Sequence, residues 1–401
     1  MTSAIAADPA ALRVLFLTHA FPRWSGDAAG SFLLRFARAL RQVGIEVSVL
    51  APHAADLPTR DSIDGIEVIH FRYAPTSLET LAYTGTMAEQ VSGSWSARLS
   101  LGSMLGAGFW RVLREQRRLA PHLVHAHWWF PSGVVAAATS RLSQVPFVTT
   151  MHGSDVRLAR STTGAATGLA WVMRASRATM TVSKWLADEA HAMTPDLPAP
   201  RVSPMPAATE LFTPSGTRAP DRLLFVGRLN AQKGIELLLR ALAAMRARPH
   251  LDVVGDGPDV ESLRGLASSL GIADRVTWRG ALPQTALPDL YRRAAALVVP
   301  SRDEGLGLVA VEAQLCETPV IAFDSGGLRD IVQHGVTGIL VDVFTADALA
   351  RATDELLASP DRAASLGAAG RRAALAMFSP DAVARSYDAI YRAALEPARS
   401  K

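Results

Sequence analysis

Short runs of β-branched and other apolar residues alternate with segments of helical periodicity along the whole chain. In the first half, the apolar runs predict strands at residues 13–19, 45–51, 66–72, 123–128, 146–151 and 179–183, with helices such as 30–43 and 131–143 between them. In the second half, strands are predicted at 222–228, 251–255, 275–280, 296–300, 319–323 and 338–342, and helices at 234–247, 259–270, 286–295, 309–317 and 328–334. The alternation predicts an α/β protein in which βαβ units form a parallel sheet twice.

A proline-rich stretch separates the two halves and suits a linker, because proline cannot continue a helix. It runs from Pro204 through Pro206 and Pro214 to Pro220. We therefore predict an N-terminal domain at residues 1–205 and a C-terminal domain at 206–378. A last helix within 379–401 begins at Ser379-Pro380 and has an apolar face. We expect it to pack back onto the N-terminal domain, although its own domain is an alternative.

Composition excludes several classes of protein. The chain has 401 residues, 49% hydrophobic and 19% charged, which is typical of a globular protein and not of a disordered one. No apolar run reaches the roughly 18 residues of a spanning helix, and the N-terminus lacks the basic start of a secretory signal. Cys316 is the single cysteine, so an intramolecular disulfide and a structural zinc site are not expected. These features favour a cytoplasmic location.

The net charge of +4 comes from the N-terminal half, where residues 1–200 hold 18 Lys and Arg against 14 Asp and Glu. This excess favours an anionic acceptor or membrane surface, or simply reflects surface arginines, and it is too sparse for nucleic-acid binding. The segment from Trp110 to Arg118 combines an aromatic residue with clustered arginines. It indicates either peripheral contact with the inner face of a membrane or an ordinary helix with a basic outer face.

Two cations follow the first strand of the C-terminal half, in the segment Val226-Gly227-Arg228-Leu229-Asn230-Ala231-Gln232-Lys233-Gly234. Ligands bind at the carboxyl edge of a parallel sheet, where Arg228 and Lys233 could neutralise a diphosphate. Solvated loop charges are the alternative for such a pair taken alone.

A glycine-bearing segment between a strand and a helix predicts a phosphate site. It consists of Gly305, Leu306, Gly307 and Leu308. Glycine lets backbone N–H groups approach a ligand closely, and a helix start offers unpaired donors. Gly255, in Gly255-Asp256-Gly257, and the pair Gly326-Gly327 follow two other strands and support the same sheet edge.

Two glutamates flank this segment. Glu312 lies one to two turns into the helix and is placed to accept hydroxyl hydrogen bonds, as from a ribose. Glu304 precedes the helix, where its carboxylate could orient a sugar and balance the cations. The sequence contains no D-x-D pair that would hold a divalent cation on a nucleotide diphosphate, so we expect no metal.

In the first half, a strand, a loop containing Gly26 and Gly30, and a helix follow each other without the G-x-G-x-x-G spacing of an NAD or FAD site. His152 ends a strand before Gly153, and Asp155 is near enough to orient it. His127 follows another strand, next to His125, and together with Gly26, Gly30 and Asp155 it is a candidate for the acceptor side. For His125 and His19 a structural role is an equal alternative, and a metal site of His125, His127 and His152 has no supporting spacing.

These stretches together resemble the retaining GT-B glycosyltransferases of family four, the glycosyl transferases group 1, across essentially the whole chain. The resemblance is carried by Val226-Gly227-Arg228-Leu229 with Lys233-Gly234, the Glu304-to-Glu312 spacing, and Pro319-Val320-Ile321-Ala322 leading to Gly326-Gly327. It implies two Rossmann-like domains that face a central cleft and transfer of a hexose with retention, without a cofactor or metal. The donor would be a nucleotide sugar such as a UDP- or GDP-sugar.

The resemblance also implies residue roles. Arg228 and Lys233 would hold the diphosphate, the backbone from Gly305 to Leu308 the phosphates, Glu304 the sugar and Glu312 the ribose. His152 would contact the sugar near its reacting carbon. Gly26 and Gly30 are similar to the family's acceptor-side loop, whose adjacent glycines are absent here, and Leu306 and Asp330 replace the more usual Phe and Glu.

The acceptor would be a sugar, a lipid-linked compound or a small molecule. Two alternatives have the same architecture: a nucleotide-sugar epimerase and an inactive sugar-nucleotide binding protein.

Overall fold

The computed structural model describes residues 11–27, 29–84 and 86–397. The ends of the predicted first and last segments, residues 1–10 and 398–401, lie outside these ranges. The chain forms two compact units. The first holds the described residues up to Val182, Leu186–Pro206 and those from Pro380 on, and the second holds Ser183–Trp185 and Ala207–Ser379.

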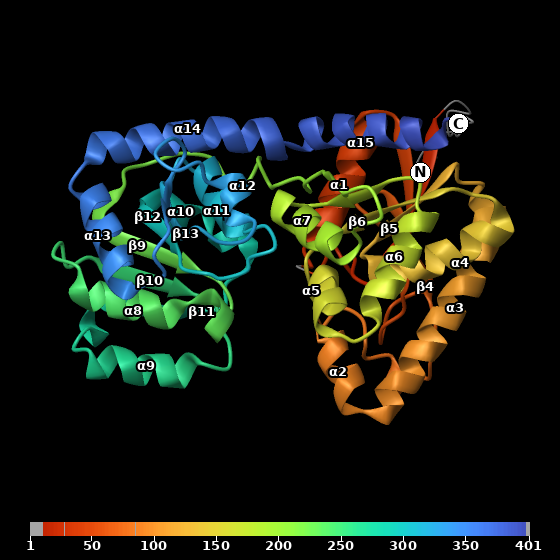
Figure 1. The fold of residues 1–401 in the computed structure, drawn as a ribbon, viewed down its shortest axis with the longest axis horizontal. Coiled ribbons are helices and arrows are strands. Elements are labelled where there is room, and N and C mark those ends of the chain that lie inside the picture. The colour runs from red at the N-terminus through yellow and green to blue at the C-terminus, as the bar shows by residue number, and fades with distance from the viewer. Residues whose placement is uncertain (1–10, 28, 85, 398–401) are drawn as a thin grey trace, which may run out of the picture. The chain divides into compact units, whose positions relative to one another are not determined.

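In the described part of the first unit, eight strands form one sheet in the order β3-β4-β2-β1-β5-β6-β7-β8 (Figure 1). Neighbouring strands are parallel except β3 and β4. The strands are β1 Leu12–Leu17, β2 Ile45–Pro52, β3 Arg60–Ile63, β4 Ile66–Phe71, β5 Leu123–His127, β6 Phe147–Met151, β7 Thr179–Thr181 and β8 Arg201–Val202. Every residue of β5 and β6 is buried, as expected for central parallel strands covered on both faces.

Helices connect and cover these strands. They are α1 Ser31–Gln42, α2 Met87–Gly93, α3 Trp95–Leu119, α4 Val134–Ser143, α5 Ser154–Ser161, α6 Ala165–Ala175 and α7 Lys184–Met193, with a short 3-10 helix at Thr76–Leu78. The predicted helix 131–143 begins later, at Val134, because Trp129–Gly133 forms a wider turn in which Phe130 has a non-helical conformation.

The second unit, every residue of which is described, has six parallel strands in the order β11-β10-β9-β12-β13-β14. They are β9 Ala219–Val226, β10 His250–Val254, β11 Val276–Gly280, β12 Ala294–Val299, β13 Val320–Phe323 and β14 Ile339–Val341. The helices are α8 Ile235–Ala244, α9 Val260–Ser269, α10 Pro288–Arg293, α11 Leu308–Leu315, α12 Leu328–Ile331, α13 Ala346–Leu357 and α14 Pro360–Phe378, with 3-10 helices at Ala231–Lys233, Ala273–Arg275 and Gln284–Ala286. The prediction of two parallel-sheet, Rossmann-like domains is confirmed.

Helix α15, Pro380–Leu395, belongs to the first unit although it follows the whole second unit in the chain. Tyr387 and Tyr391 on its inner face are fully buried. The Tyr391 hydroxyl lies 2.7 Å from Nδ1 of His125, and the Tyr387 hydroxyl donates to the Ser203 carbonyl at 3.0 Å. The last helix therefore supplies part of the core beside α1, where Phe36 contacts Tyr387 with ring centroids 4.6 Å apart.

Candidate active site

An ion pair joins two loops at the carboxyl ends of strands β9 and β12. The Lys233 ammonium lies 2.5 Å from Oε2 of Glu304, and the two side chains are 23% and 15% exposed. The Asn230 side chain caps the turn by accepting from the Lys233 amide at 3.2 Å. Gly234 has a φ of 68°, and a Cβ there would lie 2.0 Å from the Pro300 carbonyl oxygen. This close approach of the two loops brings the predicted residues Lys233 and Glu304 together.

Gly307 ends the Glu304 loop and precedes helix α11 with a φ of 92°, a left-handed conformation that favours glycine. No side chain caps this helix start, so its first amides remain available to an anion. Leu306 is buried and Leu308 is 40% exposed. The segment from Gly305 to Leu308 thus presents backbone donors beside the Lys233–Glu304 pair.

The Gly326-Gly327 pair packs directly against the backbone of Glu304 and Gly305. The Gly327 amide donates to the Glu304 carbonyl at 2.7 Å. A Cβ at Gly326 or Gly327 would lie 2.5 Å from the carbonyl oxygen of Glu304 or Gly305, respectively. The glycines are therefore required by close packing of two backbone segments, whatever ligand the site takes.

Gly255 and Gly257 likewise allow close backbone packing, here against the loop that carries Arg228. A Cβ at Gly255 would lie 1.9 Å from the Gly227 carbonyl oxygen, and one at Gly257 would lie 2.2 Å from that of Leu229. The connection after β10 therefore packs on the loop that carries Arg228. The Arg228 side chain is exposed, and no protein ion pair or hydrogen bond holds it in the described residues.

Glu312 lies on α11 with 8% of its surface exposed. Its Oε1 accepts from the Gln284 side-chain amide at 2.7 Å, and its Oε2 accepts from the Tyr291 hydroxyl at 2.8 Å. Burial, and then the Glu312 charge, raise the pKa of Tyr291, so its hydroxyl keeps the proton that it donates. The sequence analysis missed both partners, because Gln284 lies in a short 3-10 helix and Tyr291 in the short helix α10, and neither carries a motif.

The predicted histidines of the first unit form a cluster in which His127 is fully buried and His152 is half-buried. Nδ1 of His127 lies 3.2 Å from Nε2 of His152, and the Trp128 ring is tilted against His152 with ring centroids 4.4 Å apart. Burial, followed by repulsion from His19, lowers the pKa of His152 to about 3. Burial lowers the pKa of His127 well below its usual range. Both rings are therefore neutral near pH 7.

Asp155 binds the backbone of the His152 loop and not the imidazole ring, which corrects the expectation that it orients that ring. Its Oδ1 accepts from the amides of His152 at 3.1 Å and Gly153 at 3.0 Å, and its Oδ2 accepts from the Trp129 amide at 3.0 Å. Asp155 is the second residue of α5, and its short side chain reaches these amides. The neighbour of the His152 ring nitrogen is His127 instead.

The glycine loop of the first unit borders a cavity of about 860 Å³. Gly30 precedes α1 with a φ of 66°, and a Cβ there would lie 2.6 Å from the Ala20 carbonyl oxygen. Gly26 has a φ of 91° and open space around it. Gly30 and Asp155 line the cavity, whereas Gly26, His127 and His152 do not. The sequence analysis did not predict this cavity, because its walls come from segments far apart in the chain.

The comparisons with known proteins agree on one family. Residues 212–373 match the family described as glycosyl transferases group 1, and residues 28–208 match the glycosyl transferase 4-like domain. The chain is similar to the D-inositol 3-phosphate glycosyltransferase of Thermobispora bispora, with 34% identity over 93% of this chain and 91% of that protein. It is also similar to that of Frankia alni, with 34% identity over 93% and 97%.

Two solved structures share the fold. Sucrose-phosphate synthase from Thermosynechococcus elongatus superimposes with a TM-score of 0.77 and 25% identity, covering 95% of this chain and 98% of that one. Anabaena HepE in complex with UDP and glucose superimposes with a TM-score of 0.69 and 20% identity, covering 95% and 99%.

Two Rossmann-like units, with cations, a carboxylate and glycines gathered at the strand ends of the second, define a GT-B glycosyltransferase. The chain belongs to the glycosyl transferases group 1.

Within the described ranges, no group of three or more His, Cys, Asp or Glu side chains could hold a metal ion. In the same ranges, no helix is long and apolar enough to cross a membrane.

Proposed function

We propose that this glycosyltransferase transfers a hexose with retention from a UDP- or GDP-sugar to a hydroxyl group in glycolipid, polysaccharide or small-glycoside biosynthesis. The observation that carries the proposal is the Lys233–Glu304 ion pair of 2.5 Å beside the uncapped start of α11. A cation and a set of backbone donors are thereby preorganised at one place. Such an arrangement stabilises charge that develops on a departing diphosphate.

In this proposal the donor lies along the carboxyl edge of the second unit's sheet. Lys233, Arg228 and the amides from Gly305 to Leu308 bind the diphosphate, and Gly255 supports the Arg228 loop. Glu304 accepts hydrogen bonds from the sugar. Glu312, whose carboxylate also accepts from Gln284 and Tyr291, accepts hydrogen bonds from the ribose.

The transfer exchanges one bond to the anomeric carbon for another. The bond from this carbon to the diphosphate oxygen breaks, a bond to the acceptor oxygen forms, and the acceptor's hydroxyl proton leaves with the nucleoside diphosphate. Neutral His152 would contact the sugar near this carbon, and its neighbour His127 would fix its ring position. Arg228, Lys233 and the helix start would balance the leaving charge without a divalent cation.

The relatives support transfer of a hexose from a nucleotide-sugar donor to a hydroxyl group of the acceptor. One fold relative binds UDP and glucose, and the curated relatives are named for transfer to D-inositol 3-phosphate. For the acceptor side of this chain we propose the first unit, near Gly26, Gly30 and Asp155. We further propose a cytoplasmic enzyme that can contact the inner face of the membrane peripherally.

Product analysis tests the proposal. The enzyme is incubated with UDP-glucose or GDP-mannose, with and without acceptor, in the presence of a chelator. We expect slow nucleotide release without acceptor, faster release with it, and a product whose anomeric proton in NMR has the donor's configuration. Rearrangement of the donor without an acceptor would indicate an epimerase, and binding without turnover would indicate an inactive protein; either result contradicts the proposal.

A further inference from the structure

The cavity of the first unit is mostly apolar. About 860 Å³ is within the range of small-molecule sites and is enough to bury a drug-sized ligand. Its walls include the large apolar side chains of Phe32, Leu81, Met87, Leu101, Trp128 and Leu158. These residues come from α1, the β4–α2 connection, α2, α3, the turn after β5, and α5.

The polar groups at this cavity include one cation, two carboxylates and a histidine among the described lining residues. Arg98 is the cation among its described lining residues, and it already donates to the carbonyls of Val91 and Ser92 at 3.0 Å each. Burial lowers the pKa of His19 to about 4, so that ring is neutral. Glu89 and Asp155 bring carboxylates to the wall. A phosphate would meet one guanidinium, two of whose donors are already engaged, on a wall that also carries two carboxylates, whereas a hydrocarbon group would meet apolar walls.

The hairpin of α2 and α3 that walls the cavity also carries exposed apolar residues on its outer side. Trp95, Leu99 and Trp110 on α3 are 77%, 75% and 69% exposed. Gly102 and Gly106 lie between them with open space around their Cβ positions. These residues follow each other at intervals of three or four, so they form one stripe, and about 22 Å of helix separates the two tryptophans.

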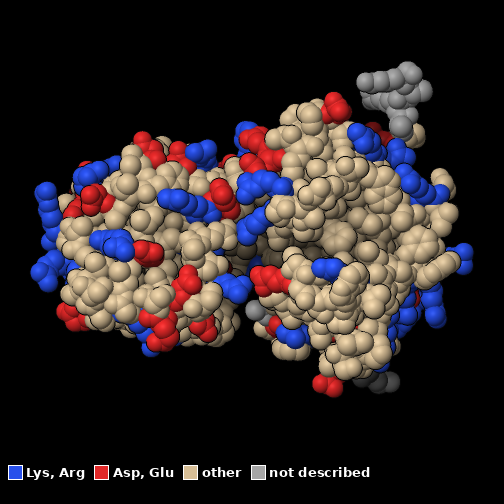
Figure 2. All heavy atoms as spheres, turned by 60° about the horizontal axis from the view of Figure 1, so that its bottom comes forward, with Lys and Arg blue, Asp and Glu red and all other residues tan. Residues whose placement is uncertain are grey.

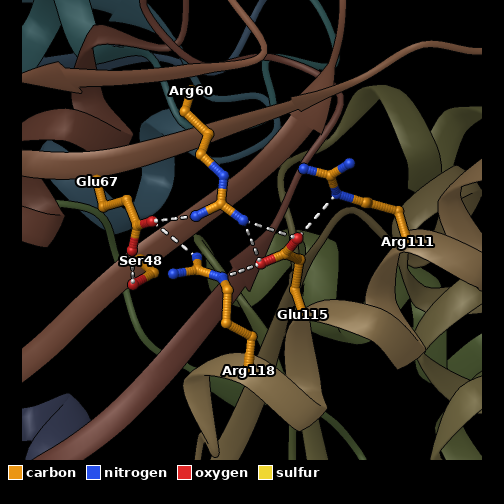
Figure 3. Close-up of polar contacts among 6 residues, drawn as sticks. All are labelled: Ser48, Arg60, Glu67, Arg111, Glu115 and Arg118. Carbon is orange, nitrogen blue, oxygen red and sulfur yellow. Dashed lines mark hydrogen bonds and ion pairs between the residues drawn. The ribbon is translucent and has the colours of Figure 1, made fainter.

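The arginines of α3 divide into two sets. Arg111 and Arg118 pair with the fully buried Glu115 at 3.0 Å and 2.5 Å. Figure 3 shows how Arg60 and Glu67, from β3 and β4, complete this network and fix α3 on the sheet. Arg114 and Arg117 remain exposed, outside the network.

Glu115 is the one acidic residue of α3, so the exposed surface of the helix carries cations without anions. The face of the first unit seen in Figure 2 is largely uncharged, with Lys and Arg along much of its edge and a few Asp and Glu as well. Tryptophan, leucine and arginine on one helix face match the interfacial and anionic layers of a lipid bilayer.

We infer that the acceptor is a hydroxyl-bearing lipid, and that the outer face of α3 lies on an anionic bilayer from which this lipid enters the cavity. Leu99 and Leu101, two positions apart on α3, are on the bilayer side and the cavity side of the same hairpin. The inference rests on the proposed function, since it names the substrate class of the acceptor side. The lipid hydroxyl takes the place of the acceptor in the bond exchange described above.

Flotation with vesicles tests the docking face. Wild-type protein is expected to bind vesicles of equal parts phosphatidylcholine and phosphatidylglycerol, and not phosphatidylcholine alone. Each arginine near an anionic surface contributes about a fivefold factor, so Arg114→Glu with Arg117→Glu should weaken binding at least 25-fold. Trp95→Ser with Leu99→Ser should also weaken it. Leu142→Ser, which removes a 66% exposed leucine from α4, is the matched control and should bind like the wild type.

The docking face would be overturned if the wild type did not bind the anionic vesicles, or if both the arginine and the Trp95–Leu99 double variants bound them as well as the wild type.

A second measurement addresses the cavity with monomeric octyl and methyl glucosides, which differ only in the length of the hydrocarbon chain. Each buried methylene contributes about a fourfold factor in affinity. We expect thermal stabilisation by the octyl compound at concentrations at least 100-fold lower, and loss of this preference in Ala88→Trp, which fills the cavity from α2.

Equal binding of the two glucosides, or tighter binding of D-inositol 3-phosphate than of octyl glucoside, would overturn the lipid acceptor. UDP and GDP are tested in the same assay. Stabilisation by a nucleotide without any alkyl preference would overturn this inference alone. No stabilisation by either nucleotide would instead contradict the proposed function, so the two failures are distinguishable.

Discussion

Replacement of Lys233 by alanine removes the cation at the centre of the proposed donor site. Its ammonium lies 2.5 Å from Oε2 of Glu304, and both side chains are less than a quarter exposed. One preorganised contact to a developing negative charge is typically worth about 3 kcal/mol of the barrier. Because 1.36 kcal/mol corresponds to a factor of ten, we expect kcat to fall roughly 100-fold in Lys233→Ala.

The effect on folding should be much smaller. A hydrogen bond to a charged group contributes about 1.5–3 kcal/mol when well buried, and partial exposure reduces this, so we expect a loss of about 1 kcal/mol in the free energy of unfolding. The assay is nucleotide release at saturating donor, together with urea unfolding of the same preparations. The double variant Lys233→Ala with Glu304→Ala should lose less activity than the product of the two single losses, because the partners act together.

Arg240→Ala is the matched control. Arg240 pairs with Glu236 at 2.9 Å on α8, which begins just after the Lys233 turn, but the two side chains are 47% and 62% exposed. An exposed pair contributes little, and we expect its kcat to stay within about twofold of the wild type. Unaltered kinetics in Lys233→Ala, or equal losses in Lys233→Ala and Arg240→Ala, would refute the assignment of Lys233 to the diphosphate.

Three further predictions address the supports of the site. Gly307→Ala should cost about 1–3 kcal/mol of stability and weaken UDP or GDP binding in calorimetry, because its φ is 92° and a Cβ would lie 2.7 Å from Leu328 Cδ2. Tyr391→Phe should cost about 1–3 kcal/mol in urea unfolding, since it leaves Nδ1 of His125 without its bond of 2.7 Å, and an unchanged midpoint would contradict this. The folded-state pKa of His152 is about 3 against a usual 6.5, so unfolding takes up a proton between these values and stability falls as the pH drops from 6.5. In His152→Phe, the melting temperature should depend less on pH in that window, and an identical pH dependence would argue against a buried neutral ring.

The sequence predicted every strand of the second unit but not its helices α13 and α14, and it missed strands β3 and β8 of the first unit. Strands such as β12 and β13 are buried at every residue, and their apolar runs are bounded by proline on one side and a charged residue on the other. Lys233 and Glu304 could be expected to meet, because the carboxyl ends of β9 and β12 are neighbours in a parallel sheet.

Features that depend on packing were not predictable in this way. Helix α3 has glycines and exposed tryptophans on its outer side, which blurs the helical pattern, and only its last third was recognised as a probable helix. Asp155 was expected at the imidazole of His152 because sequence distance says nothing of side-chain direction. Three backbone amides that converge on its carboxylate decided its position instead.

A structure of the protein with UDP or GDP bound tests the central claim most directly. The account predicts the diphosphate within hydrogen-bonding distance of the Lys233 ammonium, the Arg228 guanidinium and the first amides of α11, with the ribose at Glu312. A nucleotide bound with its diphosphate away from all three groups would contradict it.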